Sequence, residues 1–459
     1  MNPDRLERTW HLLDSLAWKP IHTRITLALG IGWMLDAFEV TIIGNVLGIL
    51  KEIWHITASQ ASLLVSVWLV GIMIGALLFG YLADRFGRRR LFILTLLLYS
   101  GFTLVSALSP GYYWFLLFRL LTAIGVGAEY SAVNAAIGEL IPARFRGRAG
   151  AAVMSFWPVG AILAAIVSLY FISALPDAVG WRVAFAIGAI MGLFTLWARK
   201  VLPESPRWLA RRGRVSEASS QSERIVANVA DFSEAAGPAP ETSDEADAGF
   251  FPRLAALARR HPGRLVLGCL LDFSEASGYY GLFAILPLIV MPMIHLGNAQ
   301  VPWFFIIGNV GAAVGGGVAA ILLDRVGRKV TVTGFYVLAA SSMLYMGAAT
   351  IHGDVSGVLV AFVVANFCAT GSWIAAYPTF SEIFPTESRA TGIGFSVAFG
   401  RIGAALAPPV LVALAEQLSV MAAFGVLAAL WLIGALAMIP WVMFGPEGRG
   451  RALEAMAPE

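Results

Sequence analysis

The chain has 459 residues, of which 58% are hydrophobic and 13% carry a charged side chain. Soluble globular domains carry about 25% charged residues. The composition therefore excludes an ordinary water-soluble domain and indicates an integral membrane protein, which the mean hydropathy of +0.76 also favours. The two cysteines, Cys269 and Cys368, lie in apolar stretches, so a disulfide framework is not indicated.

Twelve apolar stretches are long enough to cross a membrane as helices of about 20 residues. Transmembrane barrels show short alternating segments instead, so the sequence predicts an all-α membrane protein with twelve transmembrane helices. The first stretch is too long for a cleavable signal peptide, and no small-residue cleavage site follows it. The stretches begin near Ile25, Ala61, Leu91, Tyr112, Ala149, Trp181, Leu265, Pro302, Val330, Gly357, Ala390 and Met421.

The distribution of positive charge predicts the topology. With twelve spans and an internal N-terminus, only Lys51 and Arg182 of the 32 lysines and arginines fall in outer loops, and only Arg119 and Arg401 fall within spans. Cytoplasmic loops are enriched in Lys and Arg, so both termini are predicted to be cytoplasmic. The predicted domains are a tail at 1–24, a six-helix bundle at 25–202, a cytoplasmic loop at 203–263, a second bundle at 264–443 and a tail at 444–459.

The cytoplasmic loop contains two stretches, RWLARRGR and FFPRLAALARRH, that mix bulky apolar and basic residues. Such stretches favour short helices at the inner membrane surface. A plain solvated linker is the alternative, since the sequence between them, EAAGPAPETSDEADAG, is typical of a flexible linker.

Three motifs occur twice in the same order. GYLADRFGRRR (Gly80 to Arg90) follows the second span and AILLDRVGRK (Ala320 to Lys329) the eighth, whereas ELIPARFRG follows the fourth and EIFPTESRA the tenth. An Asp-x-x-Glu pair occurs in the first span and again in the seventh. Three matches at nearly the same separation predict a duplicated six-helix unit, and hence two pseudo-symmetric bundles.

The charged loop motifs predict a cytoplasmic latch that holds the outward-facing state. An acid near a helix end can pair with cationic groups or with the positive N-terminus of another helix, and glycine permits a tight turn. The alternative is that these charges only set the topology. The predicted latch residues are Gly80, Asp84, Arg85, Gly87, Arg88, Glu139, Arg146, Asp324, Arg325, Arg328, Glu382 and Arg389.

GYLADRFGRRR resembles the loop motif of the major facilitator superfamily, whose members are secondary transporters built from two six-helix bundles. The resemblance covers nearly the whole chain. PESPRWL (Pro203 to Leu209) resembles the sugar porter signature, whereas LDAFEV (Leu35 to Val40) and RATGIGFSVAFGRIGA are similar to the aromatic acid/proton symporters and niacin permeases. SGYYGLFAILP in the seventh span lacks the paired glutamines of sugar porters, and Ala37 and Glu39 stand where the aromatic acid group has Gly and Asp.

Five acids are predicted to lie within spans. Asp36 lies about 16 Å into its helix, close to the midplane, where a charge costs at least about 2.5–3.5 kcal/mol. Residues three apart share a helix face, so each Asp-x-x-Glu pair points one way. Against these acids stand only two bases, Arg119 and Arg401. The acids are Asp36, Glu39, Glu129, Asp272 and Glu275.

Five acids and two bases cannot all be charged in a low-dielectric cavity, because burial and like charge both favour a protonated carboxyl group. At least one acid is therefore expected to exchange protons. We predict that Asp36 or Glu39 couples protons, with Glu129 and Arg119 as a neighbouring relay. Asp272 and Glu275 face the cavity from the other half. For a single acid, a structural hydrogen bond is the alternative.

Arg401 is the expected anchor for a substrate carboxylate, since its planar fork binds two oxygens at once. The alternative is a permanent salt bridge to Asp272 or Glu275. If the substrate is a cation, the surplus acids bind it instead. Aromatic residues expected near the cavity could stack on a ring; these are Trp33, Phe38, Trp157, Tyr279, Tyr280, Trp373 and Tyr377. The stretch SGYYG and Pro287 predict a seventh helix that can bend.

The predicted function is proton-coupled symport of a small organic acid across the plasma membrane by a monomeric carrier. Antiport of organic cations or drugs, sugar/proton symport and a nutrient sensor with a transporter fold are the alternatives. No metal-ligand cluster, Ser-His arrangement or phosphate-cradling loop is present in the sequence, so we predict no enzyme activity, no cofactor and no nucleic-acid partner.

Overall fold

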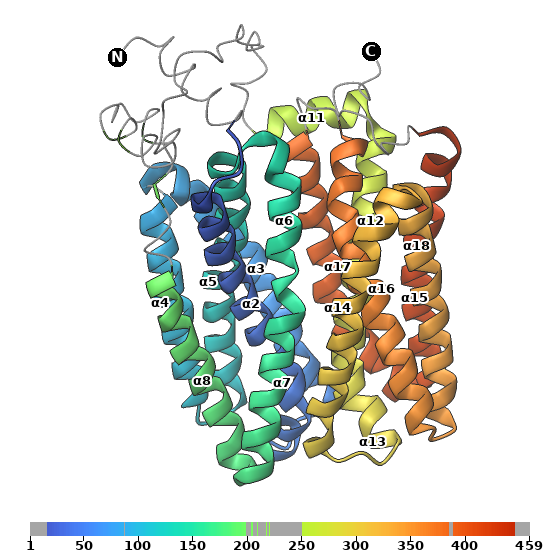
Figure 1. Cartoon of the computed structure of the whole chain (residues 1–459). Helices are drawn as coiled ribbons and strands as arrows, with labels where there is room; N and C mark the ends of the chain where they lie inside the picture. The colour runs from blue at the N-terminus through green and yellow to red at the C-terminus, as the bar shows by residue number, and fades with distance from the viewer. Residues whose placement is uncertain are drawn as a thin grey trace, which may run out of the picture.

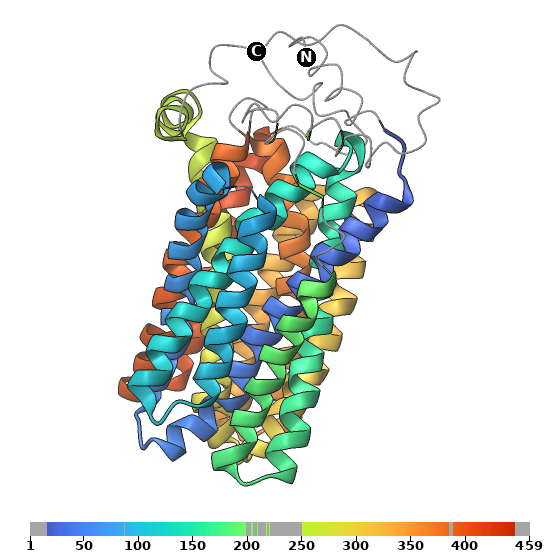
Figure 2. The same ribbon diagram turned by 90° about the vertical axis from the view of Figure 1, so that its left-hand side faces the viewer.

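The computed structural model describes residues 16–86, 88–198, 250–384 and 389–445, together with a few single residues between 203 and 220. The regular structure of this part is helical. Figures 1 and 2 show long helices packed side by side with roughly aligned axes. The short helix α11 (Phe250–Arg260) lies across one end of this bundle. The start of α2 and the end of α18 lie at this same end.

A helix occupies each of the twelve predicted apolar stretches, so the all-α prediction is confirmed. The first group consists of α2 (Pro20–Ile53), α3 (Ala58–Phe86), α4 (Arg88–Ala107), α5 (Tyr112–Leu140), η1 (Ala143–Phe145), α6 (Arg146–Met154), α7 (Phe156–Ala174) and α8 (Asp177–Ala198). The second consists of α12 (Pro262–Ile285), η4 (Leu286–Val290), α13 (Met291–Met293), η5 (Asn298–Gln300), α14 (Val301–Arg325), α15 (Arg328–Ile351), α16 (Val355–Ile383), α17 (Arg389–Gln417) and α18 (Val420–Phe444).

Two helices differ from the predicted outline. α2 begins at Pro20, five residues before the predicted start, because the polar residues ahead of the apolar run continue the helix. The fifth stretch is broken at Ser155 into α6 and α7, three residues before Pro158. A proline removes one backbone donor and favours such an interruption. The seventh stretch ends in the π-helix η4, which contains Pro287 and agrees with the expected bend.

Nine helices of the described part are long and apolar enough to cross a membrane, and two shorter apolar helices lie at Ile93–Ala107 and Tyr112–Gly127. The two helices that carry the Asp-x-x-Glu pairs are the most enclosed. In the apolar windows of α2 and α12, 83% and 78% of the residues are buried within the protein, against 39–56% in the other candidate spans. The paired acids are therefore placed at the centre of the bundle.

The two groups of helices meet through α3 with α17 and through α7 with α14. These contacts pair the second span of one repeat with the fifth of the other, as a pseudo-twofold arrangement requires. At the end opposite α11 the groups are held together, since Ser59 Oγ donates a hydrogen bond to Glu416 Oε2 at 3.1 Å. Gly44 of α2 faces Phe283 and Phe305 at this end, where any side chain would collide with their rings.

Close helix contacts within the first group depend on small residues. Gly75 of α3 lies against the carbonyl of Ile124, and Gly127 of α5 lies against the carbonyl of Ile72. A methyl group at either position would collide with backbone, which is rigid. Small residues at membrane helix interfaces permit this close approach.

The predicted latch lies only partly within the described residues. Gly327 has φ +103°, in the left-handed region that favours glycine, and so makes the turn before α15. Arg328 Nη1 donates to Leu323 O at 3.3 Å, and Arg146 Nε donates to Ile141 O at 3.1 Å. Arg325 is exposed. The latch stays a prediction, because these residues or their side chains lie outside the described part: Gly80, Asp84, Arg85, Gly87, Arg88, Glu139, Asp324, Glu382 and Arg389.

Candidate substrate cavity and buried charges

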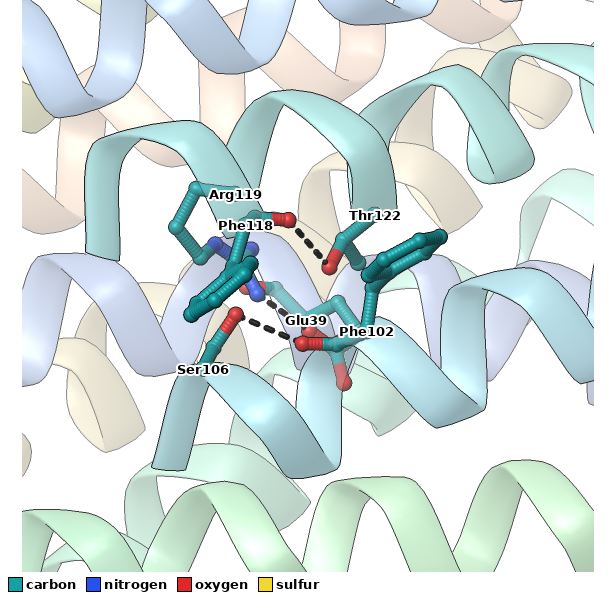
Figure 3. Close-up of polar contacts among 6 residues, drawn as sticks. All are labelled: Glu39, Phe102, Ser106, Phe118, Arg119 and Thr122. Carbon is teal, nitrogen blue, oxygen red and sulfur yellow. Dashed lines mark hydrogen bonds and ion pairs between the residues drawn. The ribbon is translucent and has the colours of Figure 1, made fainter. Parts of the chain in front are cut away.

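A buried ion pair joins α2 to α5 (Figure 3). Arg119 Nη1 donates to Glu39 Oε2 at 2.8 Å, and Arg119 Nη2 donates to the Glu39 carbonyl at 3.3 Å. Both side chains are buried. The guanidinium lies over Trp68, 4.0 Å from its ring centre, and 5.2 Å from the ring centre of Phe185. Aromatic faces thus cover a pair that water does not reach.

Two hydroxyl groups beside this pair donate hydrogen bonds to backbone carbonyl groups. Figure 3 shows Ser106 donating to the Phe102 carbonyl at 2.7 Å and Thr122 donating to the Phe118 carbonyl at 2.9 Å. Each hydroxyl has one hydrogen, so neither donates to Glu39 in this arrangement. Arg119 therefore supplies the charged hydrogen bond that compensates the Glu39 charge, and the side chain of Thr103 hydrogen-bonds Glu39 as well.

Asp36 and Glu39 are both buried on α2. Their spacing predicts one shared face, but their side chains have neighbours on different helices. Glu39 faces α5 within the first group of helices. Asp36 acts electrostatically on Tyr280 of α12, which belongs to the second group. Asp36 therefore lies where the two groups meet.

A cavity of about 520 Å³, including its part open to solvent, lies between the two groups of helices. On the wall formed by the first group of helices, the ring centres of Trp33 and Trp157 are 6.1 Å apart. The Trp157 side chain hydrogen-bonds that of Tyr279, which belongs to the second group. Most of the surface is aromatic or apolar, as is typical of sites for small organic molecules. The lining residues are Trp33, Met154, Trp157, Glu275, Tyr279, Tyr280, Ala369, Thr370, Trp373 and Ile374.

Five of the predicted cavity aromatics are therefore brought together. Phe38 is buried instead against Gly188 of α8. The side chain of Tyr377 lies outside the described residues.

Arg401 of α17 lies beside the cavity and is 4% exposed. Its guanidinium carbon is 5.4 Å from the ring centre of Trp373 and 5.9 Å from that of Tyr280, and it hydrogen-bonds the Tyr280 hydroxyl. It is also close enough to Asp272 and Glu275 to interact electrostatically with both. A charged fork that borders flat aromatic faces can bind a carboxylate while a ring stacks beside it.

Glu275 is the carboxylate among the residues that line the cavity. Ser372 Oγ of α16 donates to Glu275 Oε1 at 2.9 Å, and the Tyr336 hydroxyl of α15 lies 3.4 Å from Oε2. Tyr336 and Ser372 were not predicted, because a single hydroxyl in an apolar helix carries no motif. Asp272 lies against Gly400, where no side chain would fit.

Glu129 is buried on α5, ten residues after Arg119. At 1.5 Å per residue the two are about 15 Å apart along the helix. The structure therefore does not place them in direct contact, and the neighbouring relay expected from the sequence lacks a direct link. Within the described residues, no group of three or more His, Cys, Asp or Glu side chains is arranged to hold a metal ion.

Comparison with known proteins agrees with this architecture. Residues 31–459 match the family "Sugar (and other) transporter". The chain is 30% identical to the niacin transporter NiaP of Acinetobacter baylyi, over 97% of this chain and 98% of that one. It is 28% identical to the putative niacin/nicotinamide transporter NiaP of Bacillus subtilis, over 95% and 99%.

Solved structures show the same fold at low identity. The xylose transporter XylE of Escherichia coli, in a partially occluded inward-open conformation, superposes with a TM-score of 0.74 at 22% identity, covering 95% of this chain and 100% of that one. A bacterial homologue of the human lysosomal transporter Spinster gives 0.65 at 17% identity, over 93% and 96%. The chain therefore belongs to the sugar (and other) transporter family and is a multi-pass membrane transporter of the major facilitator superfamily, not an enzyme.

Proposed function

We propose that the protein is a proton-coupled symporter that carries a small aromatic carboxylate of the nicotinate type across the plasma membrane. The observation that carries this proposal is the position of Arg401 beside Trp373 and Tyr280, at a cavity with aromatic walls from both groups of helices. A guanidinium offers a carboxylate two parallel hydrogen bonds, and flat rings stack favourably on aromatic faces. The whole site comes from one chain, which fits a monomeric carrier.

The relatives named as niacin transporters support this substrate class. The cavity surface supports it as well, since its tryptophan and tyrosine rings suit a flat apolar ring better than a hydroxyl-rich sugar. Transport of the carboxylate together with protons would offset its negative charge, which avoids the cost of carrying an anion through a low-dielectric barrier.

We assign the driving proton to Glu39. A buried carboxylate and guanidinium are stable as a charged pair, and removing one charge leaves the other uncompensated. Proton uptake by Glu39 would therefore release Arg119 and loosen the connection between α2 and α5. Since α2 also lies at the cavity, this release would link protonation to movement of the helices around the substrate.

The proposal is tested by uptake into proteoliposomes. With a proton gradient directed inward, we expect accumulation of labelled nicotinate, little uptake of xylose or tetraethylammonium, and loss of accumulation when a protonophore removes the gradient. Arg401→Ala should abolish nicotinate uptake. Arg259→Ala, which removes an exposed arginine of α11 away from the cavity, is the matched control and should retain it. Uptake of xylose or tetraethylammonium in place of nicotinate, or nicotinate uptake that ignores the proton gradient, would overturn the proposal.

A further inference from the structure

We propose that Glu275, together with the hydroxyl groups of Tyr336 and Ser372, forms a second proton-binding site that opens into the substrate cavity and is separate from Glu39 and Arg119. Tyr336 and Ser372 act as positioning residues for this carboxyl group. The inference rests on the proposed function in assuming that protons drive uptake, and it adds where a proton meets the substrate.

Three helices converge on the Glu275 carboxyl group. The residue itself is on α12 and lines the cavity, Ser372 approaches Oε1 from α16, and Tyr336 approaches Oε2 from α15. All three side chains are buried. Glu39, by contrast, meets a charged guanidinium at 2.8 Å. The two glutamates occupy corresponding places in the repeated motif, but Glu39 has a charged hydrogen-bond partner and Glu275 has hydroxyl groups.

The position of the Tyr336 hydroxyl hydrogen determines which protonation state of Glu275 this contact stabilises. A phenol has one hydrogen to donate. The Tyr336 oxygen lies 2.9 Å from the Leu271 carbonyl and 3.4 Å from Glu275 Oε2, so the shorter contact takes the hydrogen. The lone pairs of the phenol oxygen are then left for Glu275, which can use them only when it is protonated and donates. Tyr336 therefore favours the neutral form of Glu275.

Ser372 favours the opposite state. Its Oγ lies 2.9 Å from the Ala369 carbonyl and also 2.9 Å from Glu275 Oε1, so the hydroxyl hydrogen can turn to either acceptor. When Glu275 is ionised, donation to Oε1 is strengthened by the charge. The site thus offers a hydrogen-bond partner to each protonation state, as a group that gains and loses a proton during transport requires.

Charged and titratable neighbours connect this site to the substrate. Asp272 lies one turn earlier on α12 and Arg401 faces Glu275 from α17, while Asp36 of α2 acts on Tyr280 of the same cavity. A substrate carboxylate bound to Arg401 would offset the positive charge that stabilises ionised Glu275. Substrate binding would then promote proton binding at Glu275, and by reciprocity the proton would increase substrate affinity.

The test is the pH at which nicotinate uptake is half-maximal. Loss of one hydrogen bond to a charged carboxylate corresponds to about 1–2 pH units, and loss of one between neutral partners to about 0.5–1 pH unit. We expect Tyr336→Phe to move the half-maximal pH toward acid by the smaller amount, because the protonated form loses its acceptor. Ser372→Ala should move it toward alkali by the larger amount, because the ionised form loses its donor. Ser341→Ala is the control: it removes an exposed hydroxyl of α15 that donates to the Val337 carbonyl, and it should leave the profile unchanged.

A second measurement does not depend on transport. Purified wild-type protein in weakly buffered detergent should take up protons when nicotinate is added, as recorded by a pH indicator, and Glu275→Gln should lose this uptake when both proteins are compared at saturating nicotinate. Shifts of Tyr336→Phe and Ser372→Ala in one direction, or unchanged proton uptake in Glu275→Gln, would overturn the inference while leaving proton-driven transport intact. Uptake that ignores the proton gradient in the wild type would instead overturn the proposed function.

Discussion

The ion pair of Glu39 and Arg119 gives a direct test of the buried charges. Arg119→Met keeps a long flexible side chain but removes the guanidinium nitrogen that lies 2.8 Å from Glu39 Oε2. Two unit charges 4 Å apart attract each other by about 4 kcal/mol at an effective dielectric constant of 20. The contact with Trp68, 4.0 Å from its ring centre, contributes about 2 kcal/mol more because it is desolvated.

Together these magnitudes amount to about 6 kcal/mol, and the net loss is smaller because removal of the Arg119 charge also removes its desolvation cost; removing one partner of a buried pair usually costs about 3–5 kcal/mol. We expect Arg119→Met and Glu39→Gln each to lower the free energy of unfolding by about this amount. The double variant should regain most of the loss, since no uncompensated buried charge remains. Thermal unfolding in detergent ranks the wild type, the two single variants and the double variant by stability. The order of their unfolding temperatures is informative even where unfolding is irreversible.

Transport assays then separate stability from coupling. Exchange of labelled for unlabelled nicotinate needs no net proton movement, so it should survive in the double variant, whereas accumulation driven by a proton gradient should fall sharply. A double variant less stable than either single variant would refute this view of the pair. So would an Arg119→Met protein with wild-type stability and a wild-type pH profile.

Three further predictions concern the cavity and the helices around it. Arg401→Lys keeps the charge but loses the two-pronged geometry, so KM for nicotinate should rise by about tenfold, equivalent to about 1.4 kcal/mol, and an unchanged KM in uptake assays would contradict carboxylate binding there. Gly400→Ala places a methyl group against Asp272 and should destabilise the protein by about 1–3 kcal/mol, whereas Gly394→Ala on the same helix meets open space and serves as the thermal-unfolding control. Ser59 Oγ and Glu416 Oε2 are 3.1 Å apart, so cysteines at these two positions should cross-link with a short thiol reagent and stop uptake until reduced; full uptake in the cross-linked protein would show that this end need not open.

The sequence located the helices well because lipid leaves few other solutions. A segment within hydrocarbon must satisfy its own backbone hydrogen bonds, so long apolar runs such as those of α14 and α18 become helices with little ambiguity. The early start of α2 and the break at Ser155 were missed, because polar helix ends and local interruptions depend on the neighbouring helices rather than on hydropathy.

The sequence predicted which helices carry the buried acids, but not which side chains those acids contact. The i, i+3 spacing of Asp36 and Glu39 indicated one shared face of α2, and the structure shows that both side chains are buried. It could not indicate that Glu39 meets Arg119, 80 positions along the chain, while Asp36 is directed toward Tyr280. Such pairings depend on helix rotation and tilt, which hydropathy does not report. Tyr336 and Ser372 were missed for the same reason.

The internal repeat explains why the two glutamates can have different tasks. In each half the first helix of the repeat supplies the glutamate and the fourth supplies a partner: α2 and α5 bring Glu39 to Arg119, and α12 and α16 bring Glu275 to Ser372. A guanidinium stabilises an ionised carboxyl group strongly, so the proton at Glu39 must be linked to a large rearrangement. A hydroxyl group costs little to reorient, so the proton at Glu275 can follow the substrate in and out of the cavity. On this view, duplication supplied two equivalent acids, and a charged hydrogen-bond partner at Glu39 and a neutral one at Glu275 assigned the first to the movement of the bundles and the second to the occupancy of the site.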